Sequence, residues 1–184
     1  MWSRVPVIIL RELTVKRVGF DRRGGYVVRV LFVCMGNICR SPVAAAVFRD
    51  LVAENNLSES IGVDSAGTYD FHTGAPADER AVESAARRGV DLSRHRARRV
   101  CEEDFRAFDY VLAMDRDNYD DLLSMCPSGN ADRVRLLLRF APHLGVDEVP
   151  DPYYGGHSGF EHVLDMVQEA SIALLEHITH RDLD

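Results

Sequence analysis

The sequence predicts an α/β protein with a doubly wound parallel sheet, and two observations lead to this fold class. Short continuous runs of β-branched and aromatic residues, typical of strands buried on both faces, recur along the chain. Segments whose apolar residues repeat at helical spacing lie between these runs. Strands that alternate with helices favour a parallel sheet with helices on both faces, and 184 residues suit a single domain.

Four strands and four helices are expected in alternation. The strands are residues 30–33, "IGVDSAG" from Ile61, "DYVLAM" from Asp109 and "VRLLLRF" from Val134. The first helix follows the first strand directly, with Ser41 as its N-cap and Pro42 at its first position. The later helices are "ADERAVESAARRG", "DRDNYDDLLSM" and "SGFEHVLDMVQEASIALLEHI". Four parallel strands flanked by helices in this order indicate a flavodoxin-like domain.

Composition and charge exclude several classes of partner. No apolar run approaches the ~20 residues that a bilayer span needs. The early run "VPVIIL" is short, is followed by Arg11 and Glu12 and lacks a cleavage site, so we expect neither a signal peptide nor a membrane anchor. A net charge of −7 argues against nucleic acid as the main partner.

The cysteines and histidines indicate the compartment and exclude a metal. Four cysteines in a chain of this size fit a reducing compartment, so we expect a cytoplasmic protein, with secretion by an unconventional route left open: Cys34, Cys39, Cys101 and Cys126. His177 and His180 share a helix face, but no carboxylate or cysteine joins them at ligand spacing. We expect neither a metal nor another cofactor.

The N-terminal segment differs in composition from the rest of the chain. Six basic and two acidic residues lie within the first 28 positions, whereas the whole chain is acidic. Residues 1–26 are therefore expected to be an extension and residues 27–184 the domain. Two readings of the extension stay open: a weakly ordered arm, or sequence upstream of a true translation start at Val27 or Val28.

The stretch "VLFVCMGNICRSPVAAAVF" places reactive side chains in the loop between the first strand and the first helix. In a parallel sheet this loop lies at the carboxyl end of the strand, where backbone N–H groups and a helix N-terminus attract an anion. Five residues separate Cys34 from Arg40, so a loop curled around one oxyanion can present a thiol at its base and a guanidinium at its rim. Arginine matches the oxygens of a phosphate, and such surroundings favour a thiolate, which is a nucleophile for phosphoryl transfer.

The neighbouring residues favour this chemistry over a buried cysteine beside a surface arginine. Gly36 and Asn37 tolerate the positive φ that a tight loop demands, and Ser41 can donate its hydroxyl to the sulfur. Asp151 offers an acid in a later loop, which matters because a phenol has a pKa near ~10 and leaves slowly unless it is protonated. The alternative for Asp151 is an Asp-Pro pair that starts a turn.

The segment "VCMGNICRSP" resembles the phosphate-binding loop of the low-molecular-weight protein tyrosine phosphatases, and "DPYYGG", "DSAGT" and "FDYVLAMD" match further motifs of this family. The resemblance extends from about Val30 to the last helix. It implies a phosphatase domain that hydrolyses phosphotyrosine through a cysteinyl-phosphate intermediate. Cys34 would be the nucleophile, Arg40 the phosphate clamp and Asp151 the general acid and base.

The resemblance also assigns supporting roles. The residues that would form or support the phosphate-binding loop are Met35, Gly36, Asn37, Ile38, Cys39 and Ser41. Ser65 and His95 would belong to the hydrogen-bond network that holds the shape of this loop. Phe71, Tyr153 and Tyr154 would form the aromatic walls of the cleft, with Phe71 at a site where the family often has Trp. The residues themselves leave other readings open: His95 on a solvated basic face, and the tyrosines as phosphorylation sites.

The role of Cys39 and the choice among the activities known for this type of loop remain open at this point. Cys39 is close enough in sequence to protect Cys34 by a disulfide, or it packs in the loop. Arsenate reductases of this fold add paired cysteines that Cys101 and Cys126 do not reproduce, and arginine phosphatases tend to carry Thr in place of Ile38. A phosphotyrosine-binding module without turnover would not need Asp151. We expect phosphotyrosyl proteins as substrates and a monomeric enzyme.

Overall fold

A four-stranded parallel sheet forms the centre of the domain, in the computed structural model that describes residues 27–154 and 156–183. The side chains of residues 154, 156 and 157 lie outside this description, as does the expected N-terminal extension. The strands, in the order β2-β1-β3-β4, are β1 (Val28–Cys34), β2 (Ile61–Gly67), β3 (Tyr110–Ala113) and β4 (Val134–Leu136). The predicted α/β class is confirmed.

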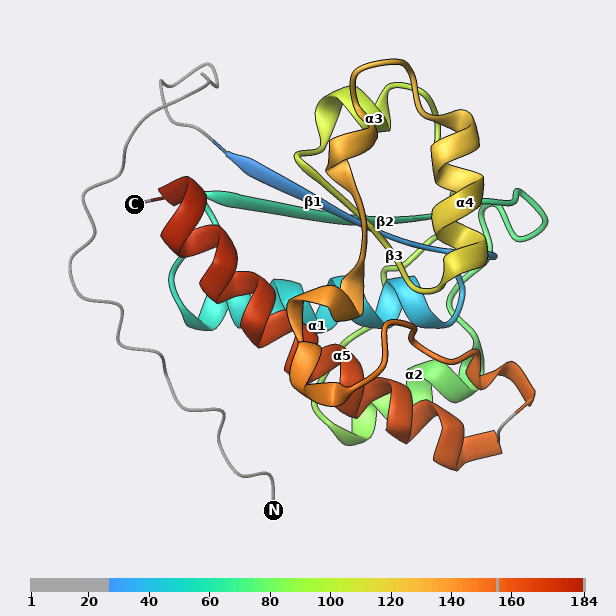
Figure 1. Ribbon diagram of the computed structural model, residues 1–184. Helices are drawn as coiled ribbons and strands as arrows, with labels where there is room; N and C mark the ends of the chain where they lie inside the picture. The colour runs from blue at the N-terminus through green and yellow to red at the C-terminus, as the bar shows by residue number, and fades with distance from the viewer. Residues whose placement is uncertain (1–26, 155, 184) are drawn as a thin grey trace.

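Helices cover both faces of the sheet (Figure 1). One face carries α1 (Arg40–Glu54), α2 (Glu79–Arg87) and the long α5 (Gly156–Ile178). The other carries α3 (Asp104–Ala107) and α4 (Arg116–Met125). A π-helical turn (Thr179–Leu183) continues α5. No helix of the described chain is long and apolar enough to cross a membrane.

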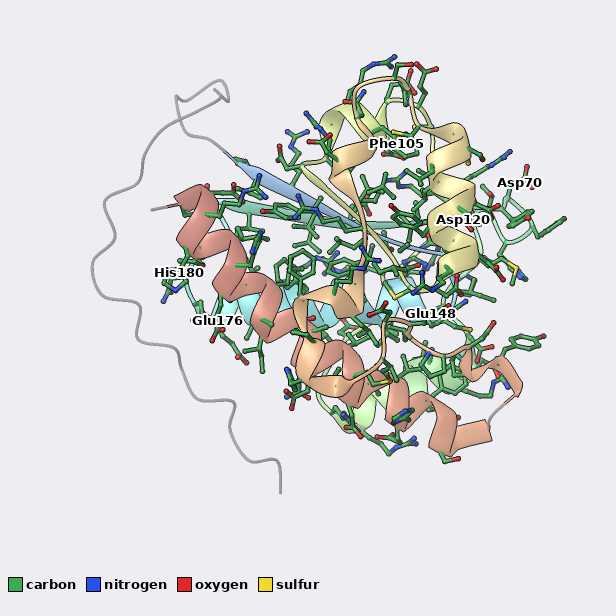
Figure 2. All side chains as sticks on the ribbon, viewed as in Figure 1. Asp70, Phe105, Asp120, Glu148, Glu176 and His180 are labelled. Atoms are coloured by element: carbon green, nitrogen blue, oxygen red, sulfur yellow. The ribbon has the colours of Figure 1, made fainter. Side chains whose placement is uncertain are left out.

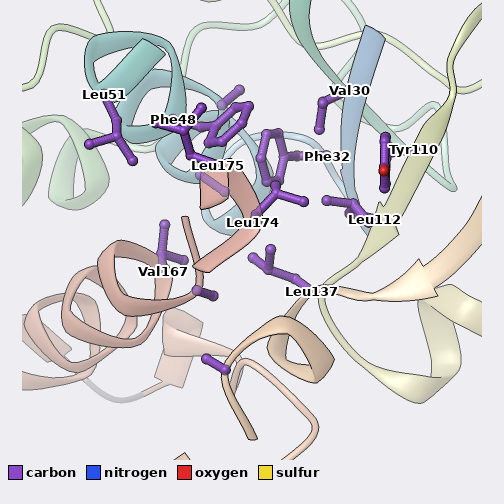
Figure 3. Packing of buried hydrophobic residues seen from close by; sticks show 14 of the residues in the cluster. Val30, Phe32, Phe48, Leu51, Tyr110, Leu112, Leu137, Val167, Leu174 and Leu175 are labelled. Carbon is purple, nitrogen blue, oxygen red and sulfur yellow. The ribbon is translucent and has the colours of Figure 1, made fainter. Parts of the chain in front are cut away.

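Strand β1 is apolar from Val30 onward because both of its faces are buried there. Phe32 meets Phe48 of α1 edge to face, with ring centroids 5.6 Å apart, in the cluster shown in Figure 3. Leu31 and Val33 point to the opposite cluster, which Phe105 of α3 also enters. Burial on both faces fixes the position of Cys34 at the end of the strand. Charged side chains such as Asp120 and Glu148 project from the outside of the domain (Figure 2).

Two of the differences from the expected element boundaries have a clear physical reason. Helix α1 begins at Arg40, so Ser41 lies inside its first turn and is not the N-cap; its hydroxyl contacts the sulfur of Cys34. The fourth strand ends at Leu136, because Leu137–Phe140 form a 3-10 turn. The turn buries two consecutive leucines, Leu137 and Leu138, in the cluster that includes α5. A strand would have pointed them to opposite faces.

Candidate active site

The loop after β1 is held against the end of β2. The carbonyl of Cys34 accepts a hydrogen bond from Thr68 N (2.9 Å), and the carbonyl of Met35 accepts one from Tyr69 N (3.0 Å). Gly67 lies beneath this loop, and a Cβ atom at Gly67 would stand 2.6 Å from the Met35 oxygen. A glycine is therefore required at the end of β2, a requirement that the sequence analysis did not single out.

Asn37 sets the shape of the loop from within. It is fully buried and adopts φ 54°, the left-handed conformation expected of it. Its Nδ2 donates to the hydroxyls of Ser41 (2.9 Å) and Ser65 (3.0 Å), and its Oδ1 accepts from the backbone of Arg98 (2.9 Å). Every polar atom of this amide is engaged, which fixes the turn.

Gly36 does not take the positive φ that the sequence suggested. Its lack of a side chain serves a close approach instead, since a Cβ atom there would lie 2.9 Å from Cδ2 of His72. The His72 ring lines the same cleft as Gly36. Gly36 thus leaves room for an imidazole at the rim of the loop.

His95 contacts the loop and does not lie on a solvated basic face. The ring is half-buried, and its Nε2 lies 2.7 Å from the carbonyl oxygen of Asn37. Burial lowers the pKa of His95 more than this bond raises it, so the ring is neutral at neutral pH. A carbonyl only accepts, so Nε2 carries the proton that it donates to Asn37.

Cys34 lies at the floor of the loop with 3% of its surface exposed. Its Sγ is 3.0 Å from the hydroxyl oxygen of Ser41. That hydroxyl already accepts from Asn37, so its own proton points to the sulfur or to the carbonyl of Ala66, 3.2 Å away. Ser41 can therefore donate to a thiolate at Cys34.

Arg40, the first residue of α1, is held between two carboxylates. Its Nη1 donates to Asp115 Oδ2 (2.5 Å) and to the carbonyl of Val149 (3.1 Å), and its Nη2 lies 3.6 Å from Asp151 Oδ2. Burial alone would lower the pKa of Arg40, but Cys34, Asp115 and Asp151 outweigh it and raise that pKa. The guanidinium is permanently charged.

Asp115 is a site residue that the sequence analysis missed. One of its oxygens caps α4 by accepting from Asn118 N (2.7 Å), while the other accepts from Arg40. The sequence feature that could have identified Asp115 is its position directly after a buried strand, because that position lies at the carboxyl edge of the sheet, as Cys34 does. Asp115 thereby couples the start of α4 to the orientation of Arg40.

A cleft of about 300 Å³ opens above the loop. Its rim carries Phe71, which is 79% exposed, and Tyr153, which is 47% exposed. Asp151 lies on the same wall and accepts a hydrogen bond from Tyr153 N (3.0 Å). The other lining residues are Met35, Gly36, Ile38, Cys39, Arg40 and His72. Asn37, Ser41 and Ser65 are buried, and the predicted wall residue Tyr154 has its side chain outside the described residues.

Arg80, at the start of α2, supports the Asp151 loop and was also missed. Its guanidinium donates to Asp78 (2.8 Å) and to the carbonyl of Tyr153 (2.8 Å), and lies 5.0 Å from the Tyr153 ring centre.

Cys39, close to Arg80, has a raised pKa. Burial and, after it, the charge of Asp78 raise the pKa of Cys39 to about 12. Cys39 is thus a neutral thiol that faces the cleft. The described residues hold no cluster of three or more His, Cys, Asp or Glu suited to a metal ion.

We expect Gly67→Ala to displace the loop and lower kcat/KM on the order of 10²-fold, because an added Cβ meets backbone atoms that cannot move aside. Gly62→Ala, in the same strand, is the matched control, since its Cβ would meet nothing closer than 3.6 Å. Steady-state kinetics on both variants, with circular dichroism to verify folding, test this. Equal activity in the two variants would contradict it.

Comparison with known proteins agrees with this geometry. The model of the low molecular weight phosphotyrosine protein phosphatase family matches residues 29–183. A putative low molecular weight protein-tyrosine-phosphatase of Synechocystis is 44% identical over 80% of this chain and 94% of its own length. A protein tyrosine phosphatase from Entamoeba histolytica superposes with a TM-score of 0.81 at 40% identity, over 85% of this chain and 99% of its own. An arginine phosphatase from Drosophila reaches 0.76 at 32% identity, over 83% and 99%. The chain belongs to the low molecular weight phosphotyrosine protein phosphatase family.

Proposed function

We propose that the protein hydrolyses phosphotyrosine in proteins through a cysteinyl-phosphate intermediate. The observation that carries the proposal is the placement of Cys34 and Arg40 on one loop at the base of a cleft whose wall carries Asp151. A phosphate in this loop meets backbone N–H groups, the N-terminus of α1 and the charge of Arg40. The sulfur lies beneath the phosphorus, on the side opposite the leaving oxygen.

The reaction takes place in two displacements. The Cys34 thiolate attacks phosphorus while the bond to the tyrosine oxygen breaks, and Asp151 gives its proton to that oxygen. Water then attacks the cysteinyl phosphate, Asp151 takes a proton from the water, and the S–P bond breaks to release phosphate and thiolate. Asp115 and the Val149 carbonyl hold Arg40 in place for both steps.

The cleft supports an aryl phosphate in preference to a phosphorylated guanidine. Phe71 and Tyr153 flank the entrance, and Ile38 contributes an apolar side chain beside the loop. These walls match the faces of a phenol ring. We further propose a cytoplasmic, monomeric enzyme without a membrane or nucleic-acid partner. Its four free cysteines suit a reducing compartment.

The Cys34→Ser variant tests the proposal directly. We expect it to keep the fold and to bind phosphate or vanadate, yet to lose turnover of a phosphotyrosyl peptide, because a serine hydroxyl is a far weaker nucleophile. The parent is assayed on phosphotyrosyl and phosphoarginyl forms of one peptide. Substantial residual turnover in the variant would show that Cys34 is not the nucleophile. A preference of the parent for the phosphoarginyl peptide would contradict the proposed phosphotyrosine substrate.

The role of Asp151 is tested through the leaving group. General acid catalysis contributes ~10²–10⁴-fold, so Asp151→Asn should lose about this much on phosphotyrosine. The loss should shrink as the pKa of the leaving group falls, because an acidic phenol leaves without help. Rates on a series of aryl phosphates measure this slope. The same loss on every substrate would mean that Asp151 only positions its loop.

We also propose that Cys39 protects Cys34 under oxidation. Peroxide converts the Cys34 thiolate to a sulfenic acid, and the Cys39 thiolate then attacks that sulfur, releases hydroxide and closes a disulfide. Because the pKa of Cys39 is about 12, its thiolate fraction rises with pH and closure should accelerate from pH 7 to 9. Recovery of activity by dithiothreitol is measured for the parent and for Cys39→Ser. Full recovery of the variant would remove this role.

A further inference from the structure

A second cleft, of about 430 Å³, adjoins the first. The two clefts share Met35, Arg40 and Asp151, so the phosphate-binding loop is their common boundary. Tyr69, which stacks on Phe71 with ring centroids 5.7 Å apart, stands on its wall. The remaining lining comes from Asp115, the N-cap of α4, and from side chains of α4 between Asp117 and Asp121. A group bound beside the phosphorylated residue would therefore enter this second cleft.

Helix α4 lines the second cleft with carboxylates that have no cation partner. Asp117, Asp120 and Asp121 make no ion pair within the part of the chain that the structure describes. Asp117 lies in the first turn, where the helix dipole stabilises an acid, but Asp120 and Asp121 lie beyond it. Asp117 repels both of them at the i, i+3 and i, i+4 spacings, so stability of the helix does not account for the arrangement.

Asn118 gives an independent sign of a ligand at the same place. It lines the cleft with 2% of its surface exposed, and its Oδ1 accepts no hydrogen bond from any described residue. A buried amide oxygen without a donor is costly, and natural proteins leave few of them. The missing partner is a hydrogen-bond donor.

We propose that the second cleft binds a cationic side chain, a guanidinium above all, that lies next to the phosphotyrosine of the substrate. This rests on the proposed phosphatase activity and specifies its substrates as phosphotyrosyl segments with an adjacent arginine. A guanidinium supplies several N–H donors to the carboxylates and, once the buried Asn118 side chain turns toward the cleft, to its amide oxygen. An aromatic ring such as that of Tyr69 stabilises the guanidinium further. Carboxylates gathered for a metal would lie closer together, and the described residues contain no such cluster.

Arg40 does not repel this cation, because its charge is already matched. Asp115 lies 2.5 Å from its guanidinium, and the substrate phosphate adds further negative charge. The cleft beyond Arg40 therefore presents the net field of Asp117, Asp120 and Asp121. Such a field raises both the affinity for a cationic segment and its rate of encounter.

The test compares phosphotyrosyl peptides that carry Arg or Gln beside the phosphotyrosine, on either side and one residue further out. For at least one position we expect kcat/KM to favour Arg roughly tenfold at low salt, and less at high salt. Asp120→Asn with Asp121→Asn should bring this ratio close to one. Glu54→Gln with Glu59→Gln removes the same charge from exposed positions at the opposite edge of the sheet and should leave the ratio unchanged.

A second variant addresses the amide oxygen. Asn118→Leu keeps the size of the side chain and should lower the Arg preference without lowering the unfolding midpoint, because a buried oxygen without a donor is removed. Equal rates on Arg and Gln peptides in the parent, or the same loss of preference in the Glu54 and Glu59 control, would overturn the inference. Failure of all phosphotyrosyl peptides to react would instead overturn the proposed function.

Discussion

The close approach of the Met35 carbonyl to the α-carbon of Gly67 is the constraint on which the site depends. The loop can lie on the end of β2 because no side chain stands between them. This contact sets the height of the loop, and the Asn37 amide below it sets the curvature by binding Ser41, Ser65 and the backbone of Arg98. Together these contacts fix the distance between the Cys34 sulfur and the N-terminus of α1.

Electrostatics divides the carboxyl edge of the sheet into two regions. At the loop, the N-terminus of α1 and Arg40 create a positive site, and Asp115 limits its extent by pairing with the guanidinium. Beyond Asp115, α4 presents the carboxylates of Asp117, Asp120 and Asp121, which form no ion pair with the described residues. One aspartate thus stands at the border, because it caps the acidic helix and also orients the basic clamp. A substrate of the proposed kind, which spans this border, would meet charges of both signs.

Local patterns predicted the parts of the molecule that depend on neighbours in sequence. The apolar run before Cys34, the spacing to Arg40 and the left-handed Asn37 lie within one short stretch, so propensity and motif suffice there. Ser41 was predicted to be an N-cap because a serine hydroxyl before a helix usually accepts a hydrogen bond from a backbone N–H group. In this protein the hydroxyl contacts the sulfur of Cys34. The carboxylate partner of Arg40 lies 75 positions away, and the pairing of Arg80 with the Tyr153 carbonyl spans 73. Such pairings depend on the tertiary fold, so the spacing of residues in the sequence does not predict them.

The anchoring of the Asp151 loop to α2 has a consequence for the timing of the reaction. Arg80 connects Asp78 to the Tyr153 backbone, so the segment that carries the acid is ordered before any substrate arrives. The entropy of ordering it is lost during folding and does not burden each encounter. In the proposed reaction, less of the free energy of substrate binding is therefore needed to order this segment.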